Sequence, residues 1–296
     1  MLVDAHVHLA LNHLFSRRAW EAAGRDKRTA WLREILREYK RRGICILRDG
    51  GDAYFVSELV REIAREEGMI YKTPVYALYK KGRYGSFLGK PIADRRDFKR
   101  EFKLLLDHGA DHLKIILTGL VNFNKYGDVG GTSFRADELQ YMVNAAGEHG
   151  LPVMVHANGE DGVAAAVAAG VHTLEHGYLI SEAQIYGMAE KGIVWVPTLS
   201  PLGNILQSGD SRFSAKEREI IGRVYAGQAE NIRKAVEMGV RIALGSDAGA
   251  YAVHHGDGLL NEIEHLQKIG FNRWVIEKMC LENGIRALKI DQHSTG

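Results

Sequence analysis

The segment Val-Asp-Ala-His-Val-His, residues 3–8, alternates apolar and polar side chains almost at the start of the chain. In a β-strand this period of two places Asp4, His6 and His8 on one face, with the two imidazoles about 6–7 Å apart along the strand. Two neutral imidazoles held side by side can form half of a zinc site. The plain alternative is a strand with two chance histidines, because 13 of the 296 residues are His. The segment thus predicts a strand whose apolar face is covered by helices, and a metal site if further ligands follow.

Seven glycines beyond this segment each follow a stretch of helical pattern and precede a short apolar run. Glycine just past a helix end accepts the left-handed conformation that terminates the helix, so each one predicts a turn from helix to strand. With the opening strand, these turns predict eight strands. The seven residues are Gly43, Gly68, Gly109, Gly150, Gly170, Gly192 and Gly239.

The predicted strands cover residues 2–8, 44–48, 69–78, 112–117, 152–156, 172–176, 193–197 and 241–245. Between them, apolar residues recur every 3.6 positions, as in amphipathic helices. Eight alternating β and α elements in a chain of 296 residues are typical of a (β/α)₈ TIM barrel. A doubly wound open sheet is the alternative, but the sequence has no glycine-rich phosphate loop of the dinucleotide type. We find no linker and expect one domain, residues 1–296, closed by further helices over residues 271–288.

Composition narrows the class of protein. A net charge of +2 gives no electrostatic reason to expect nucleic acid or an anionic membrane as a partner. Asp4, His6 and His8 interrupt any apolar stretch of a signal peptide, and no apolar run is long enough to span a membrane. Two cysteines are too few for a disulfide scaffold and fit a reducing compartment. We therefore expect a cytoplasmic protein that acts on a small molecule and that could form homo-oligomers.

Polar residues at the carboxyl ends of the predicted strands are the candidate site, because active sites of such barrels lie there. In the fourth strand the apolar residues face outward and turn Lys114 into the barrel, where an ammonium needs an anionic partner or a modification. His156 and His176 end the fifth and sixth strands, and Asp247 follows the eighth, all with inward parity. Each has an alternative, since the histidines could be hydrogen-bonded core residues and Asp247 could cap the next helix. Together with the histidines of the first strand, they predict a metal centre at one rim of the barrel.

At these positions the chain resembles the amidohydrolase superfamily, most closely its imidazolonepropionase-like and prolidase-like branch. The likeness extends from Leu2 to about Ile290. The segments that carry it are Asp4-Ala5-His6-Val7-His8, Lys114-Ile115, His156-Ala157-Asn158-Gly159, Glu175-His176-Gly177 and Gly245-Ser246-Asp247-Ala248-Gly249.

The resemblance implies a barrel with a centre of two divalent ions, most simply two zinc ions per chain. The implied ligands are His6, His8 and Asp247 for a first ion, His156 and His176 for a second, and a carboxylated Lys114 as the bridge. Carboxylation of the amine would turn a buried cation into an anionic oxygen ligand. It would therefore also remove the cost of burying the Lys114 ammonium.

The reaction that the resemblance implies is hydrolysis of an amide-type C–N bond in an N-acyl amino acid, a dipeptide or a cyclic amide. A divalent metal lowers the pKa of a bound water from about 16 towards 7, and Asp247 would pass the proton to the leaving nitrogen. Arg48, Tyr178 and His255 are the candidate substrate contacts, and the loop Lys80-Lys81-Gly82-Arg83 could also meet a substrate carboxylate or be a solvated loop. Two other functions stay open: an esterase or lactonase that uses the same metal site, and a non-catalytic metal-binding barrel.

Two features depart from the family pattern. Members usually carry a small flanking β-sandwich, but here only Met1 to Val3 precede the first motif and the sequence stops at Gly296. We therefore expect a barrel that stands alone, with the surface that faces the sandwich either polar or covered by another subunit. The second departure is Asn158, where relatives often have another histidine. This change affects the expected substrate class and leaves the metal ligands as they are.

Overall fold

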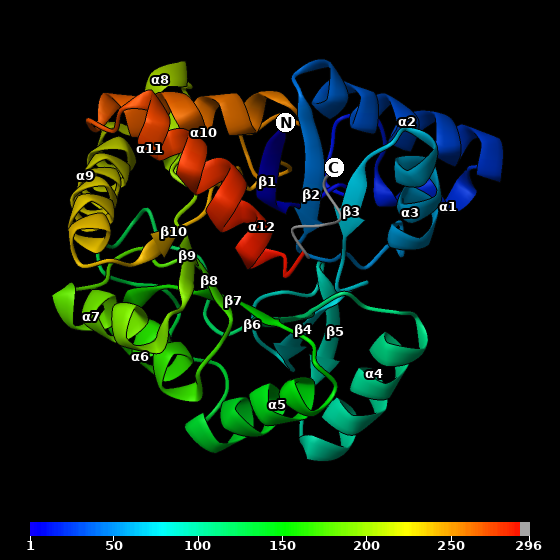
Figure 1. The fold of residues 1–296 in the computed structure, drawn as a ribbon, viewed down its shortest axis with the longest axis horizontal. Coiled ribbons are helices and arrows are strands. Elements are labelled where there is room, and N and C mark those ends of the chain that lie inside the picture. The colour runs from blue at the N-terminus through cyan, green and yellow to red at the C-terminus, as the bar shows by residue number, and fades with distance from the viewer. Residues whose placement is uncertain (291–296) are drawn as a thin grey trace.

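Within residues 1–290, which the computed structural model describes, strands and helices alternate along the chain, and the helices form an outer ring around the strands (Figure 1). The strands are β1 (Leu2–Val7), β2 (Ile44–Asp49), β3 (Ile70–Lys72), β4 (Ala77–Lys80), β5 (Gly89–Ile92), β6 (Leu113–Ile116), β7 (Val153–Ala157), β8 (Thr173–His176), β9 (Val194–Val196) and β10 (Arg241–Ile242). The helices are α1 (Arg17–Ala22), α2 (Arg25–Arg41), α3 (Ser57–Glu66), α4 (Arg95–Asp107), α5 (Ala136–Glu148), α6 (Gly159–Ala169), α7 (Glu182–Lys191), α8 (Ser200–Ser208), α9 (Ala215–Glu237), α10 (Asp257–Lys268), α11 (Arg273–Lys278), the π-helix η1 (Met279–Asn283) and α12 (Gly284–Ala287). None of the helices in this part of the chain is long and apolar enough to cross a bilayer.

The paired strands run parallel and form two ladders, in the orders β1-β2-β3 and β10-β9-β8-β7-β6-β4-β5. β3 and β4 are successive parts of one chain segment, which belongs to both sheets. At the other seam β1 joins the segment that follows β10. The N–H of Ala5 donates to the carbonyl of Leu244 at 2.9 Å, and that of His8 donates to the carbonyl of Ala248 at 2.8 Å. Eight chain segments thus surround the centre, and the predicted (β/α)₈ barrel is confirmed.

The third barrel segment differs from its predicted form. Residues 69–78 are not one strand, because the segment breaks between β3 and β4. Pro74 has no N–H to give to a ladder, and Val75 has a φ of +67°, outside the β region. The sequence pattern does not predict β5 beside β4, since Gly89 and Pro91 both weaken a strand signal. The break divides the ladder into two sheets.

The predicted turns from helix to strand are confirmed by the backbone. All seven turn glycines have φ between +65° and +81°. At Gly170 and Gly192 this left-handed residue directly ends α6 and α7. The glycines at the helix ends therefore predict the order of the βα units correctly.

Two apolar layers hold the barrel together. The larger packs the outer faces of the strands against the ring of helices, and Leu36, Leu78 and Leu139 belong to it. A smaller cluster lies between the strands and α12 and includes Ile46 and Ala287. Figure 1 shows α12 crossing the centre of the ring of strands. Because α12 covers the amino ends of the strands, a site can form only at their carboxyl ends.

β1 does not alternate strictly. Its ladder with β2 shifts register between Asp4 and Val7. Val3 and Ala5 belong to the inner cluster beneath the site, whereas Val7 packs in the outer layer. Helices therefore cover the apolar residues of β1 as predicted, but from two sides, with Val3 and Ala5 beneath α12 and Val7 against the outer ring. The register shift re-aims the end of the strand, where the two histidines lie.

Candidate functional site

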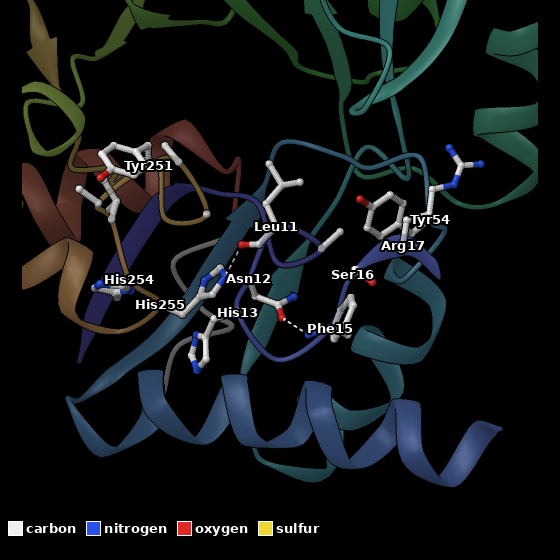
Figure 2. A pocket seen from close by; sticks show the side chains of 15 residues that line it. Leu11, Asn12, His13, Phe15, Ser16, Arg17, Tyr54, Tyr251, His254 and His255 are labelled. Carbon is white, nitrogen blue, oxygen red and sulfur yellow. Dashed lines mark hydrogen bonds between the residues drawn. The ribbon is translucent and has the colours of Figure 1, made fainter. Parts of the chain in front are cut away.

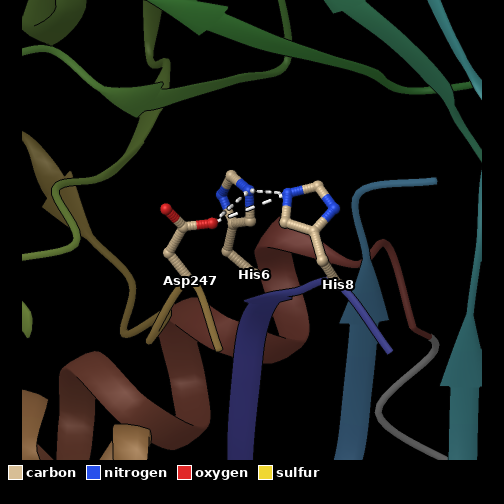
Figure 3. Close-up of side chains that lie close together, drawn as sticks. All are labelled: His6, His8 and Asp247. Carbon is tan, nitrogen blue, oxygen red and sulfur yellow. Dashed lines mark hydrogen bonds and ion pairs between the residues drawn. The ribbon is translucent and has the colours of Figure 1, made fainter. Parts of the chain in front are cut away.

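Three side chains, one from β1, one from the residue that follows it and one from the segment after β10, meet at the carboxyl ends of the strands (Figure 3). One atom from each of His6, His8 and Asp247 lies within 4.8 Å of the other two. The two Nε2 atoms are 3.3 Å apart, and each is 3.5 Å from Asp247 Oδ1. Imidazole nitrogens and carboxylate oxygens are ligands that zinc accepts. The chemistry and the close spacing of this set therefore fit a divalent metal ion.

Two more histidines extend the group. His156 lies near the end of β7 and His176 ends β8. Their ring centroids are 4.6 Å apart, and the ring of His176 is 4.9 Å from that of His6. His176 Nδ1 lies 2.7 Å from Thr198 Oγ1, and His156 Nε2 lies 3.2 Å from the carbonyl oxygen of Gly119. The histidines predicted from four separate motif positions thus form one continuous cluster.

All four of these histidines are neutral at neutral pH. Burial lowers the pKa of His6 and His176 well below the usual range of histidine. It also lowers the pKa of His8 to about 3 and that of His156 to about 4, with the charge of Lys114 as the next contribution in both cases. A neutral imidazole keeps a lone pair for a metal. The cluster is therefore in the protonation state that a ligand set requires.

Lys114, on β6, lines the same cavity as His8, His156 and His176. Its side chain is buried, and its Nζ has no hydrogen-bond partner within residues 1–290. Burial lowers the pKa of the Lys114 amine to about 8, although the carboxylate of Glu175 opposes the shift. A buried amine without a partner is costly and rare in native proteins. The unpaired amine therefore fits a site in which a metal ion or a covalent modification supplies the missing partner of Lys114.

The backbone around Asp247 is held in an unusual conformation. Asp247 has a φ of +57°, which is uncommon for a residue other than glycine. The Asp4 carboxylate accepts bonds from the N–H of Ser246 at 2.9 Å and from its hydroxyl at 2.6 Å, and the N–H of Asp247 donates to the carbonyl of His6 at 2.8 Å. Burial raises the pKa of Asp247 to about 7, and the charge of Lys114 opposes that rise. Backbone strain that neighbouring bonds enforce is typical of functional sites.

A buried ion pair supports the first histidine. Glu175 Oε2 accepts from His6 Nδ1 at 2.7 Å, and the same carboxylate accepts from Arg48 at 2.9 and 3.1 Å. Arg48 also donates to the carbonyl of Ala5 at 2.7 Å and to Thr173 Oγ1 at 2.8 Å. Because Glu175 holds the proton on Nδ1, Nε2 of His6 is left free to bind a metal. Sequence reasoning assigns no role to Glu175, although it adjoins a motif histidine.

Replacing Glu175 by glutamine should destabilise the fold, because Arg48 would remain buried without its counter-charge. Breaking one side of a buried ion pair typically costs about 3–5 kcal/mol, which urea unfolding of the metal-free protein would measure. Glu182→Gln is the matched control, since Glu182 pairs with Lys234 at 2.7 Å on the surface and should cost less than about 1 kcal/mol. Equal losses in the two variants would contradict a structural role for the buried pair.

A cavity of about 270 Å³ opens onto the cluster. His8, Lys114, His156, His176 and Asp247 line one part of it. The remainder is mostly aromatic and aliphatic and is contributed by Leu11, Tyr84, Phe87, Leu88, Ile116, Leu120 and Tyr251. Sequence reasoning misses these residues, because most lie in connections that carry no helical or strand periodicity. The one signal in the sequence that could have identified these wall residues is that most of them are apolar although they lie in loops.

The three predicted substrate contacts do not line this cavity. Arg48 lies within the buried ion pair and Tyr178 donates to the carbonyl of Thr198 at 2.5 Å. Figure 2 shows His255 in a neighbouring cavity of about 480 Å³, where its Nε2 donates to the carbonyl of Leu11 at 2.9 Å. Arg48 and Tyr178 are buried, His255 is half-buried, and all three are bonded to protein groups, so none of them faces the cavity beside the histidine cluster. Their polarity alone could not distinguish structural bonds from substrate bonds.

Comparison with known proteins gives a match to the family model described as "Amidohydrolase family" over residues 2–293. An uncharacterized protein of Mycobacterium tuberculosis (strain ATCC 25618 / H37Rv) is 31% identical over 139 residues, which cover 45% of this chain and 36% of that protein. Ochratoxinase of Aspergillus niger is 29% identical over 157 residues, which cover 53% of this chain and 32% of the enzyme. The matched part thus spans only about a third of the length of these curated relatives.

Solved structures agree in fold. A Xaa-Pro dipeptidase with methionine bound in its active site has a TM-score of 0.79 at 23% identity, and the match covers 98% of this chain and 75% of that one. The A. niger ochratoxinase structure also has a TM-score of 0.79, at 20% identity, with 97% and 71% of the two chains covered. At this level of identity the likeness bears on the fold.

Proposed function

We propose, from the premise that this chain belongs to the amidohydrolase family, that it is a metal-dependent hydrolase that cleaves an amide-type C–N bond. The observation that carries the proposal is the convergence of His8, His156, His176, the partnerless Lys114 and the strained Asp247 on one cavity, with His6 buried directly behind them. The Xaa-Pro dipeptidase of the same fold adds support for an amide as the bond that is cleaved.

The metal ligands that we propose are the residues described above. His6, His8 and Asp247 would hold one divalent ion, His156 and His176 would hold a second, and a carboxylated Lys114 would bridge them. Zinc suits the imidazole-rich set. When bound, the ions would activate water and polarise the carbonyl of the substrate.

The state of Lys114 favours carboxylation. Only a neutral amine attacks carbon dioxide, forming an N–C bond and releasing a proton as the carbamate appears. An amine with a pKa of about 8 has a larger neutral fraction at pH 7 than a solvent-exposed lysine. The carbamate would then supply the oxygens that the partnerless Nζ lacks.

The chain itself moves the proton. Asp247 Oδ1 faces His6 Nε2 and His8 Nε2, and its carboxylate can accept a proton from the attacking water and give it to the leaving nitrogen. The polypeptide holds this carboxylate in place through Asp4, Ser246 and the carbonyl of His6. The Glu175 carboxylate keeps the His6 ring in the tautomer that offers Nε2.

Metal analysis of the purified protein should find close to two divalent ions per chain, because six ligands exceed what one tetrahedral zinc can use. Chelation should abolish turnover of amides, and zinc with bicarbonate should restore it. A stoichiometry of one that zinc and bicarbonate do not change would refute the binuclear centre. Amide turnover that survives complete metal removal would refute the hydrolase mechanism, and a parallel set of esters and lactones tests whether those bonds are preferred.

A further inference from the structure

The charge of the cavity wall bears on the substrate. Within residues 1–290, Lys114 is the single lysine or arginine that lines the cavity above the histidines. The remaining charged group that lines it is the carboxylate of Asp247. A substrate carboxylate in this cavity would therefore meet no cationic side chain beyond Lys114, which the proposed function commits to the metal centre.

Three arginines around this region have partners. Arg48 is buried and bonded to Glu175 at 2.9 Å. Near the mouth, Arg212 lies over the ring of Tyr251 at 4.0 Å and pairs with Asp210 at 3.2 Å. In the neighbouring cavity Arg17 pairs with Glu21 at 2.8 Å. Of the three, only Arg48 is buried within its ion pair, whereas Arg17 and Arg212 are exposed.

The position of a substrate carboxylate follows from covalent geometry. In a dipeptide or an N-acyl amino acid, one carbon separates the scissile nitrogen from the carboxylate carbon, so the carboxylate lies within about 4 Å of that nitrogen. With the scissile bond at the histidine cluster, the carboxylate must therefore lie inside the same cavity.

The rest of the wall favours an apolar ligand. Tyr84, Leu88 and Ile116 form an apolar surface beside the cluster. Phe87 and Leu120 also line the cavity but are 38% and 56% exposed, which is high for large apolar side chains. A bound apolar group would cover both and gain the free energy of burying them.

We infer that the substrate of this site is an uncharged amide with an apolar group, without a carboxylate next to the scissile nitrogen. The inference rests on the proposed function, which it narrows from amides in general to amides of apolar amines and cyclic amides. Dipeptides and N-acyl amino acids with a free carboxylate become poorer substrates, because the described wall offers that carboxylate no lysine or arginine partner beyond Lys114.

Two compounds that differ only by this carboxylate test the inference on the zinc-loaded protein: N-acetyl-2-phenylethylamine and N-acetyl-L-phenylalanine. We expect kcat/KM to be at least about tenfold higher for the uncharged compound, and its addition should raise Tm more than addition of the acid. Leu120→Arg places a cation at the mouth and should shift the ratio at least about tenfold towards the acid. Leu104→Arg is the matched control on α4, since Leu104 is also exposed but does not line the cavity, and it should leave the ratio unchanged.

The two readouts separate this inference from the proposed function. Preference of the wild-type protein for the acid, in both kcat/KM and Tm, would overturn the inference while leaving the hydrolase intact. If neither compound is cleaved but the uncharged one alone raises Tm, the inference stands and amide hydrolysis fails. If neither compound is cleaved or changes Tm, the inference is overturned as well.

Discussion

Asp247→Asn is expected to lower the turnover of the zinc-loaded protein by at least about 10²-fold, because asparagine cannot accept the proton that the carboxylate would carry to the leaving nitrogen. The amide has nearly the same shape as the carboxylate. The backbone N–H of residue 247 should still donate to the carbonyl of His6, and the left-handed conformation of this residue should persist. The Tm should therefore change little. Steady-state kinetics on an amide that the wild-type protein turns over well would measure the loss.

Asp107→Asn provides the control for Asp247→Asn. Asp107 is an exposed carboxylate at the end of α4, paired with Lys103 at 2.6 Å, and its replacement should leave turnover within about twofold. Near-native turnover of Asp247→Asn would show that another group carries the proton. The metal content of each variant must be measured alongside, so that loss of an ion is distinguished from loss of the proton carrier.

Lys114→Met should abolish most turnover and reduce the metal content, yet make the metal-free protein more stable. The thioether fills a similar volume without burying an amine that lacks a hydrogen-bond partner. Lys114→Ala leaves space in which acetate could supply the missing oxygens, and partial rescue of turnover by acetate would support the bridging role. Full metal content and full turnover in Lys114→Met would contradict that role.

The pH dependence of stability gives a second measurement on Lys114. Its pKa is about 8 in the folded, metal-free protein and 10.5 as the ordinary value. Between these values the unfolded lysine binds a proton that the folded one has released, so stability should rise with pH across this window. Relative to Lys114→Met, the free energy of unfolding of the wild-type protein should increase by about 3 kcal/mol across this pH window. Urea unfolding at pH 8 and at pH 10.5 measures this. If the difference in unfolding free energy between the two proteins were the same at both pH values, the burial of an unpaired amine would be contradicted.

Most of the barrel follows from local pattern. Glycines at helix ends and alternating apolar runs are short-range signals, and they predict seven of the eight barrel segments as strands. Lys114, His156 and His176 could be placed at one rim because parallel strands all end on the same side of a barrel. Strand parity fails in β1, where a register shift between Asp4 and Val7 depends on pairing with β2.

The contacts of long polar side chains were beyond prediction. The sequence does not tell whether Arg48 meets a substrate or Glu175, because the two residues meet only when β2 and β8 close the same barrel. The cavity wall was missed for a related reason. Tyr84 and Leu120 lie in loops whose course depends on the packing of several elements, and such loops have no periodic signal.

The contact between β1 and the last barrel segment, which follows β10, affects the order of folding during synthesis. Asp4 bonds to Ser246, 242 positions later, and the N–H of Val3 contacts Cys280 Sγ, 277 positions later. At a translation rate of about 5–20 residues per second, β1 would wait roughly 10–50 s for these partners. Throughout that time the first strand has an unpaired edge that can associate with other chains. A strand edge that stays open for so long favours association between chains during synthesis.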